Sequence, residues 1–559
     1  MTVPLPPAEA LAKRAAEWAF ALVSMPSVTG SADEAAFGYA LQERIATSPA
    51  FARAGGRVWT IPLNDAPGRV CVAALLRGNG PATVVLTGHY DTVRIDDYGL
   101  LAPLALQPLP LRDGLIERLS AANRGMAEGR ALEDFRSGAF LPGRGLLDMK
   151  SGLGAGLAVL EEFAAAPQRI GNLLFLAVPD EEANSAGARC AAAALPGIAR
   201  DQSIRLDAAI NLDSLVDDGE GKLGRSVALG TIGKLLPSAL VVGEPVHASN
   251  ALAGLNAGAL AAEIIAGMEW ATELTDRTGE ELGPPPTLLG VKDSRTAYDV
   301  TTPDHVWIYW NVMTHRRGPE EVLSSMRALC VAAASRVRAR LQARAAALGA
   351  TARLGDEPPV ITFSELRADV LGRSPEAVQP FEDLARDAAE RGLDLPDQCR
   401  LLTEHLWLAS GRAGPAIVIG FASLPYLPTS LRGQAGGNLE AAVRLAAAGT
   451  ARRHGVSIGV SQVFPGISDM SFLGQTDLAA IPFVGANTPA WGSGIDWPAE
   501  GGGAGLPIVN AGPWGRDYHT PLERLHTGYA FDVLPELLLA IVQHILQPAT
   551  GSRETNPDA

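Results

Sequence analysis

Short apolar runs alternate with helical patterns along the first part of the chain. Residues 8–23 have the periodicity of an amphipathic helix, and apolar runs follow at 70–77 and 83–87. Residues 173–178 (LLFLAV) have the length and composition of a buried strand, and 206–212 repeats that pattern. Strands that alternate with helices predict an α/β domain built on a mostly parallel sheet with helices on both faces.

The pattern changes between residues 222 and 350. The predicted elements there are, in order, strands at 225–232 and 238–246, a helix at 256–270, strands at 287–300 and 305–313, and a helix at 320–347. This order predicts a small α+β, ferredoxin-like domain that is inserted into the first domain.

The domain organisation follows from these two patterns. We expect a catalytic domain in two parts, 1–221 and 401–548, on either side of the insertion at 222–350. The acidic segment 351–400 has no clear pattern and is treated as a connecting segment, and 549–559 is expected to be a disordered tail. A chain of 559 residues has ample material for two or more domains.

One segment of the first domain interrupts the strand and helix pattern. Residues 96–140 are rich in Leu, Pro and Arg and have weak periodicity. We predict a long excursion over the surface there, with helical character near 121–135.

Composition and charge narrow the class of protein. Hydrophobic residues make up 47% of the chain and charged residues 19%, which is typical of a globular enzyme. The net charge of -15 argues against nucleic acid as a partner. No apolar run reaches the ~18 residues that a membrane span needs, and the N-terminus lacks the pattern of a signal peptide. The four cysteines form no C-x-x-C pair, so we expect reduced thiols in a cytoplasmic protein.

Two adjacent carboxylates, Glu181 and Glu182, follow the apolar run at 173–178. Pro179 stands between them and the strand and ends its ladder, because proline has no N–H to donate. Charge at the mouth of a buried strand is costly in free energy unless something compensates it. A metal ion would do so. Taken alone, however, this stretch is better explained as a solvated acidic turn, and the rest of the chain is needed to favour a metal.

His89 and Asp91 stand just past the end of the run at 83–87. Residues i and i+2 of an extended segment share a face. His89 can therefore face a metal while Asp91 accepts a hydrogen bond from the other ring nitrogen, an arrangement that fixes the tautomer of a metal-bound histidine.

Further candidate ligands lie at or near other element ends. Asp213 ends the run at 206–212, and His519 lies just before the final predicted helix. Asp148 precedes a helix, where the helix dipole favours an acid and a capping role is the alternative.

These candidates together suit a metal centre. The five candidate ligands are His89, Asp148, Glu182, Asp213 and His519. Nitrogen and oxygen ligands without cysteine suit zinc, with manganese or cobalt as alternatives. Five ligands exceed one tetrahedral site and suit two ions ~3.5–4 Å apart that share one carboxylate. Glu181 is then left free to act as a general base.

Five motifs carry a family resemblance: GHYDTV, LDMKSG, PDEEANSAG, NLDS and DYHTPLE. They resemble the signatures of the dinuclear zinc peptidases and deacylases of peptidase clan MH, such as acetylornithine deacetylase, succinyl-diaminopimelate desuccinylase, aminoacylase and carboxypeptidase G. The resemblance spans both halves of the predicted catalytic domain in order. GRGLLDMKSG, PDEEANSAGAR and PWGRDYH most resemble the arginine-utilisation branch of that family.

The resemblance implies a ligand assignment. One metal would bind Asp148, Glu182 and His519, and the other would bind His89, Asp148 and Asp213, so that Asp148 is the bridge. Asp91 would orient His89, and Glu181 would be the base. Met149 stands where many members of the family have an acid.

The resemblance also implies residues that meet the substrate. GEPVHASN resembles the segment whose histidine contacts the substrate carbonyl, which is His247 here. Arg316 resembles the arginine that grips a substrate carboxylate, although the adjacent Arg317 is an alternative. FPGISDMSF resembles a stretch near that carboxylate, with Ser468 as its candidate. In dimeric members the histidine comes from the neighbouring subunit, so we expect a homodimer built through residues 222–350.

We therefore expect a cytoplasmic amidohydrolase that cleaves the amide of an N-acyl amino acid or of a short peptide with a free carboxylate, possibly in arginine or amino-acid utilisation. A dipeptidase or carboxypeptidase is the alternative among enzymes. A metal-bound binding or regulatory protein without turnover is the alternative from another class. The intact Glu181 argues against that last reading, because a binding protein needs no base beside its metals.

Overall fold

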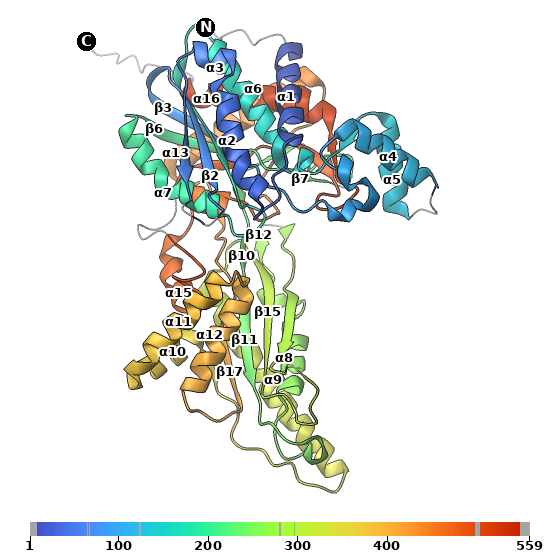
Figure 1. Ribbon diagram of the computed structural model, residues 1–559, viewed down its shortest axis with the longest axis vertical. Helices are drawn as coiled ribbons and strands as arrows, with labels where there is room; N and C mark the ends of the chain where they lie inside the picture. The colour runs from blue at the N-terminus through green and yellow to red at the C-terminus, as the bar shows by residue number, and fades with distance from the viewer. Residues whose placement is uncertain are drawn as a thin grey trace, which may run out of the picture. The chain divides into compact units, whose positions relative to one another are not determined.

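The computed structural model describes residues 8 to 547 except 64, 66, 122–124, 218, 279–280, 296 and 498–503. The chain divides into two compact units (Figure 1). Unit 1 comprises Met1–Thr231, Thr429–Thr476 and Gly502–Ala559, and unit 2 comprises Ile232–Pro428 and Asp477–Gly501. The tail expected at 549–559 lies outside the described residues.

Unit 1 is built on an eight-stranded sheet with the order β1-β2-β5-β3-β6-β20-β8-β19. The strands are β1 (Arg57–Pro62), β2 (Val70–Leu76), β3 (Asn79–His89), β5 (Ile170–Val178), β6 (Arg205–Asn211), β8 (Ser226–Ala228), β19 (Gly459–Ser461) and β20 (Ile508–Asn510). The central strands β5, β3, β6 and β20 are parallel, and β1 and β2 add an antiparallel edge. The expected α/β class is confirmed.

Helices cover both faces of this sheet. They are α1 (Ala8–Val23), α2 (Ala32–Ala46), α3 (Pro49–Arg53), α6 (Ser151–Ala165), α7 (Ala186–Asp201), α13 (Gly433–His454), α14 (Met470–Leu473) and α16 (Leu534–Leu546). One hydrophobic core joins one face of the sheet to α1, α2, α6, α13 and α16. Val72 of β2 faces that core, whereas the neighbouring Cys71 bonds the carbonyl of Gly187 in α7. Since successive side chains of a strand point to opposite faces, α7 covers the other face.

One helix of the described chain, Gly528–Leu546, is long and apolar enough to cross a membrane by length and composition. It comprises a π-helical turn, η7 (Gly528–Val533), followed by α16, and 72% of its apolar window is buried. The sequence shows no uninterrupted apolar run at this helix, because Asp532 and Glu536 interrupt its apolar residues. The burial identifies it as a helix of the unit 1 core.

The segment 96–140 is more ordered than its weak periodicity indicated. It forms η1 (Asp96–Leu104), α4 (Pro108–Ala121) and α5 (Met126–Ser137), and these helices share a small core of their own. It ends in β4 (Phe140–Pro142), which joins a second sheet of unit 1 with the order β4-β22-β21-β7. The other strands of that sheet are β7 (Leu215–Val216), β21 (Trp514–Arg516) and β22 (Arg524–His526).

Unit 2 has a mixed sheet with the order β10-β15-β11-β17-β16, and β14 also pairs with β15. Its strands are β10 (Gly233–Leu235), β11 (Pro237–Val242), β14 (Thr287–Asp293), β15 (His305–Thr314), β16 (Val360–Thr362) and β17 (Ala416–Phe421). Its longer helices are α8 (Ala257–Met268), α9 (Pro319–Ala347), α10 (Phe363–Arg373), α11 (Val378–Glu390) and α12 (Leu395–Ala409). A core packs α8 and α9 against the sheet, as the predicted α+β order requires.

The boundaries of unit 2 differ from the expected insertion at 222–350. β8, at 226–228, pairs with β19 and β20 of the unit 1 sheet, and unit 2 begins only at Ile232. At the other end, β17 pairs with β11 and β16 pairs with β17, so the segment 351–400 and the chain up to Pro428 belong to unit 2. Local patterns predict a strand but not the sheet it joins, because its pairing partners are remote in the sequence.

Candidate metal centre

The candidate ligands of unit 1 gather at the carboxyl ends of β3, β5 and β6. His89 ends β3 opposite Val178 of β5, and the turn with Glu181 and Glu182 follows β5. β6 runs parallel to β3 on its other side, and Asp213 lies two residues beyond the end of β6. Parallel strands place these ends at one edge of the sheet, which is where ligands bind in open α/β sheets.

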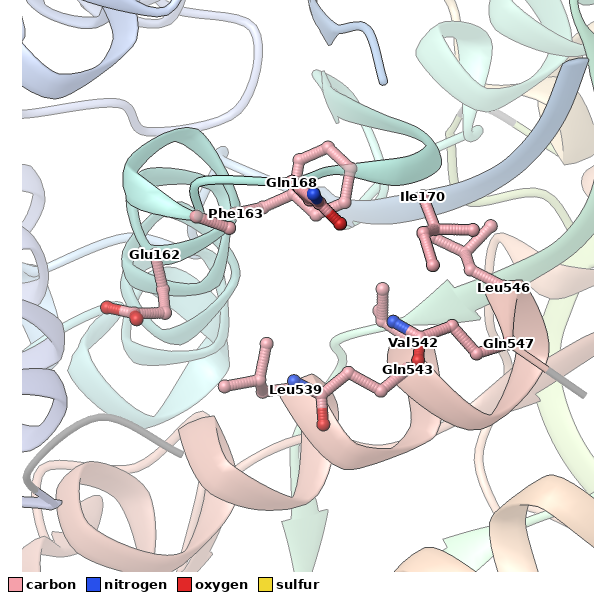
Figure 2. Close-up of a pocket in the computed structure, with 10 residues that line it drawn as sticks. Glu162, Phe163, Gln168, Ile170, Leu539, Val542, Gln543, Leu546 and Gln547 are labelled. Carbon is pink, nitrogen blue, oxygen red and sulfur yellow. The ribbon is translucent and has the colours of Figure 1, made fainter. Parts of the chain in front are cut away.

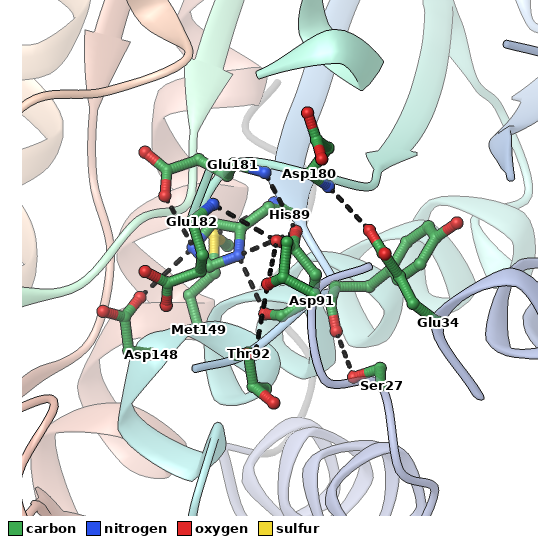
Figure 3. A network of polar contacts seen from close by, with 12 residues as sticks. Ser27, Glu34, His89, Asp91, Thr92, Asp148, Met149, Asp180, Glu181 and Glu182 are labelled. Carbon is green, nitrogen blue, oxygen red and sulfur yellow. Dashed lines mark hydrogen bonds and ion pairs between the residues drawn. The ribbon is translucent and has the colours of Figure 1, made fainter. Parts of the chain in front are cut away.

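His89, Asp148 and Asp213 form a first group that could hold a metal ion. Figure 3 shows His89 and Asp148 of this group side by side. His89 Nε2 lies 3.2 Å from Asp148 Oδ1 and 3.8 Å from Asp213 Oδ1, and all three residues are buried. Asp213 is held in place by its backbone, since its N–H donates to Asn510 Oδ1 and its carbonyl accepts from Asn510 Nδ2.

Asp148, Glu182 and His519 form a second group. His519 Nε2 lies 3.2 Å from Asp148 Oδ2 and 3.2 Å from Glu182 Oε1. The two carboxylate oxygens of Asp148 therefore face two different histidines. The prediction that His519 lies just before a helix is wrong. It lies in the turn of the hairpin between β21 and β22.

Asp91 is placed beside His89, but its contacts differ from the expected ones. His89 Nδ1 makes its hydrogen bond with the backbone carbonyl of Asp91 at 3.1 Å, and the carboxylate oxygen Oδ1 lies 3.6 Å away. The carboxylate accepts the backbone N–H groups of Glu181 and Glu182 at 3.1 and 3.2 Å and the hydroxyl of Thr29 at 2.9 Å. Asp91 thus fixes both His89 and the start of the acidic turn.

Glu181 belongs to neither ligand group. Its Oε2 lies 3.9 Å from His89 Nε2, and its side chain is 12% exposed. Burial raises its pKa well above the usual range, against the lowering effect of His89, and Asp213 and Asp469 raise it further. A carboxylate that is close to the candidate ligands yet outside both groups has the placement that a general base requires.

The turn that carries Glu181 and Glu182 is anchored by residues that sequence reasoning missed. Asp180 has a positive φ of 71°, its N–H donates to Glu34 Oε1 at 2.9 Å, and its carboxylate pairs with Arg69 (Figure 3). Glu34 is fully buried and also pairs with Arg69. No local signal links Glu34 or Arg69 to the turn, because both are remote from it in the sequence.

The pKa shifts of the candidate ligands reflect their burial and the carboxylates that surround them. Burial raises the pKa of Glu182 and of Asp213, and the charge of Asp148 adds to the increase in both. Burial lowers the pKa of His519, but hydrogen bonds with Asp148 and Glu182 outweigh it and raise the pKa to about 10. Three acids and two histidines, without cysteine, make up the two ligand groups, and this donor set fits divalent cations such as zinc.

The stretch GISDMSF contributes a buried polar pair. The side chain of Ser468 is fully buried, and its hydroxyl oxygen accepts from Asn211 Nδ2 at 2.9 Å and from the N–H of Met470. Its neighbour Asp469 was not a predicted site residue, although an acid in an apolar stretch was a signal for it. Burial raises the pKa of Asp469 to about 7.

Met149, where the sequence departs from the motifs that it resembles, lies under the first ligand group. Its sulfur accepts the backbone N–H of His89 at 3.2 Å, and the side chain is fully buried. Met149 therefore places a soft, apolar side chain behind the ligand, where it packs and leaves the ligand set complete.

The candidates His247 and Arg316 lie in unit 2. His247 is exposed, and its Nδ1 lies 2.7 Å from Ser249 Oγ. Arg316 is exposed and makes no ion pair within the part of the chain that the structure describes, whereas Arg317 pairs with Glu321 at 2.5 Å. Asp276 accepts the backbone N–H groups of both arginines and so fixes the turn that carries them.

A cavity elsewhere in unit 1 lacks the properties of an active site. It has a volume of about 50 Å³ and lies between the ends of α6 and α16 (Figure 2). Phe163, Leu539 and Val542 line it together with Gln168 and Gln543. It has room for only a few water molecules, and none of the candidate ligands lines it.

The fold and the donor set define a class: an α/β protein whose sheet edge carries a centre for divalent metal ions. Comparison with known proteins agrees. Residues 127–494 match the family described as Peptidase family M20/M25/M40. The uncharacterized protein YqjN of Bacillus subtilis is 30% identical over 95% of this chain and 96% of its own length, and Protein RocB of the same organism is 28% identical over 94% of both chains.

A solved structure confirms the fold. A tripeptidase from Staphylococcus aureus superposes with a TM-score of 0.51 at 16% identity and covers 96% of this chain and 98% of its own. The chain belongs to peptidase family M20/M25/M40. It is therefore a metal-dependent hydrolase by family, as the motifs predicted.

Proposed function

We propose that the protein hydrolyses the amide bond of an N-acyl amino acid or of a short peptide with a free carboxylate, using two divalent metal ions. Zinc fits the donor set best, and manganese and cobalt are alternatives. The observation that carries the proposal is the placement of Asp148, whose two oxygens each lie 3.2 Å from a different histidine, with Glu181 beside both groups.

The side chains of the proposed site comprise five metal ligands and one general base. His89, Asp148 and Asp213 would hold one ion, and Asp148, Glu182 and His519 would hold the other. When bound, the ions supply positive charge that acidifies water and polarises the amide carbonyl. Glu181 accepts the proton of the attacking water and delivers it to the nitrogen of the leaving amine.

Two residues of unit 2 are proposed to act on the substrate. His247 donates a hydrogen bond to the oxygen of the amide as negative charge develops on it. Arg316 binds the free carboxylate of the substrate, and its lack of an ion pair within the described chain leaves its guanidinium available, whereas Arg317 is paired with Glu321. The resemblance of GRGLLDMKSG to the arginine-utilisation branch makes arginine, or another amino acid, the proposed product.

We also propose a homodimer formed through unit 2. β14 is an edge strand, and its side chains Leu289 and Val291 are 53% and 56% exposed. Tyr298, which is 93% exposed, lies near β14 on the rim of a groove of about 890 Å³ between α8 and the chain after β14. An exposed apolar edge strand favours pairing with another strand, and a second copy of the chain would supply one. We also propose a cytoplasmic location, which the scattered cysteines of the sequence, without a C-x-x-C pair, support.

The experiment that tests the function compares Glu181→Gln with Glu182→Gln. Both changes keep the size of the side chain and remove its charge. Glu181→Gln should lower turnover by roughly 10²–10⁴-fold with both ions retained, because it removes the base. Glu182→Gln should instead lose the ion of the second group. Elemental analysis and an activity screen over N-acyl amino acids and dipeptides, with Zn²⁺, Mn²⁺ and Co²⁺, measure both quantities.

The same experiment separates the alternatives. Turnover of dipeptides but not of N-acyl amino acids would favour a dipeptidase or carboxypeptidase. Metal content of about two ions per chain without turnover of any substrate would favour a binding or regulatory protein. Equal metal loss in both variants, with turnover kept in Glu181→Gln, would show that the two glutamates have been assigned the wrong roles.

A further inference from the structure

The two candidate histidine ligands differ in how they are supported. The side chain of His89 is 2% exposed at the end of a central strand, whereas that of His519 is 39% exposed in a hairpin turn. His519 and Asp517 both have a positive φ, of 60° and 54°. Residues other than glycine adopt this conformation at a cost and keep it only where their surroundings impose it. The hairpin at 517–523 therefore needs support from elsewhere.

One support reaches the hairpin from the start of the segment 96–140. Glu523 accepts the backbone N–H of His519, and Arg144 donates to the same carboxylate oxygen at 2.6 Å. The other arm of Arg144 donates to Asp97 Oδ2 at 2.6 Å, and its guanidinium lies over the ring of Tyr98. Arg144 and Glu523 are 1% exposed, so water does not compete for these bonds.

A second support comes from the end of the same segment. Asp134 of α5 accepts from Arg516 at 2.6 and 2.8 Å and from Arg524 Nε at 2.7 Å. Arg524 also donates to Asp517 Oδ2 at 2.5 Å. The two arginines belong to β21 and β22, the strands on either side of the hairpin turn, and β4 pairs with β22. Asp97 is thus linked to the hairpin turn through Arg144 and Glu523. Asp134 contacts both strands of the hairpin through Arg516 and Arg524.

We propose that the segment 96–140 is a positioning element for the metal ion held by Asp148, Glu182 and His519. The inference rests on the proposed function, since it needs the two ions. His89 and Asp213 make no hydrogen bond with this segment in the part of the chain that the structure describes. The segment therefore sets the affinity of one metal site and leaves the other unchanged.

The test uses the full chain with Asp97→Asn and Asp134→Asn combined. These changes keep the shape of both side chains and remove the two charges that the segment presents to Arg144, Arg516 and Arg524. The matched control is Arg136→Gln, because Arg136 bonds Ser120 within the segment and has no bond to the hairpin. The metal-free proteins are titrated with Zn²⁺ by calorimetry and with Co²⁺ by visible absorption, which reports the ligand geometry at each site.

We expect one of the two dissociation constants to rise by about 10–100-fold in the double variant, as for other groups that orient metal ligands. The affected ion should be the one that His519→Gln abolishes, and its Co²⁺ spectrum should change. The other constant should stay as in the wild type, and the control should match the wild type at both sites. Restoring the charges as Asp97→Glu and Asp134→Glu should recover part of the affinity.

Two unchanged constants, or two constants that rise equally, would overturn the inference while leaving the two-ion proposal intact. A wild-type protein that binds no ion would overturn the proposed function and this inference together. If the double variant does not fold, the single variants supply the same comparison, since each removes one of the two supports.

Discussion

The two units of the molecule present their candidate residues in opposite ways. In unit 1 the side chains of His89 and Glu181 are 2% and 12% exposed, and the charge of each shifts the pKa of the other in addition to the effect of burial. In unit 2, the side chains of His247 and Arg316 are exposed, and the ring of His247 bonds the nearby Ser249. A buried, mutually bonded set is organised before a substrate arrives, whereas exposed side chains become ordered only when something binds them.

From this difference we expect unit 1 to bind the metal ions and unit 2 to bind groups of the substrate. The acids of unit 1 crowd negative charge at one edge of the sheet, and bound cations would compensate it, so we expect unit 1 to hold the metal ions. Unit 2 has no such excess at its candidates and offers a donor and a cation for groups of a substrate. Loss of a unit 1 ligand should therefore affect metal content, and loss of a unit 2 candidate should affect the rate alone.

The largest effect is expected for Asp148→Asn. Asp148 is the only residue in both ligand groups of the described chain. The change should lower the metal content from about two ions per chain to below one and abolish turnover. The matched control is Asp276→Asn in unit 2, a buried acid that accepts backbone N–H groups at 2.7 to 3.0 Å. Elemental analysis of both variants after dialysis against Zn²⁺ measures the effect.

Metal loss in Asp276→Asn equal to that in Asp148→Asn would contradict the division between the units. Full metal content in Asp148→Asn would show that Asp148 is not a shared ligand.

A smaller effect is expected for His247→Ala. Loss of a donor to the amide oxygen should lower kcat by about 10²–10³-fold, with both ions retained. In a dimer whose subunits share their sites, mixing His247→Ala chains with Glu181→Gln chains should restore part of the activity, because one site then receives a base and a histidine. Single-turnover rates, metal analysis and subunit exchange measured by light scattering or labelling make up the experiment.

Mixed chains that exchange subunits and yet stay inactive would rule out a shared site and leave His247 acting within its own chain. A protein that is monomeric at the assay concentration would exclude the proposed dimer as the active form.

The smallest effect concerns acid stability and is expected in unit 1. Burial, together with the charges of Arg225 and Arg516, lowers the pKa of His526 to about 4. The unfolded value is about 6.5, so between these values the unfolded chain binds more protons, and stability falls as the pH drops from about 6.5 to 4. In His526→Gln, the free energy of unfolding should therefore fall by about 1–2 kcal/mol less than in the wild type over this pH range.

Hydrogen exchange of the metal-free protein at pH 6.5 and pH 4.5 would measure this contribution. Peptides around residues 514–526 should lose protection in acid in the wild type and lose less in His526→Gln, whereas unit 2 peptides should respond alike in both. An identical acid response of the two proteins would contradict the assignment to His526.

Much of the architecture could be predicted from local patterns. The helix at 8–23 is found at the predicted residues, and the runs at 173–178 and 206–212 form β5 and β6 to within three residues at either end. The five ligand candidates could be chosen because charge beside a buried strand is costly and its position is visible in the sequence. The helical nature of 96–140 was only partly predicted, since its helices pack on one another and not on the main core.

The sequence by itself determined which residues could carry the chemistry. Strand ends are visible in the hydrophobic pattern, and acids or histidines placed there have few structural uses. Only the tertiary structure decided which sheet β8 and β17 join, that Asp91 holds the acidic turn with its carboxylate, and that His519 lies in a hairpin braced by Asp97 and Asp134. The reason is that hydrogen bonds and strand pairings between residues tens to hundreds of positions apart leave no periodic signal in the chain.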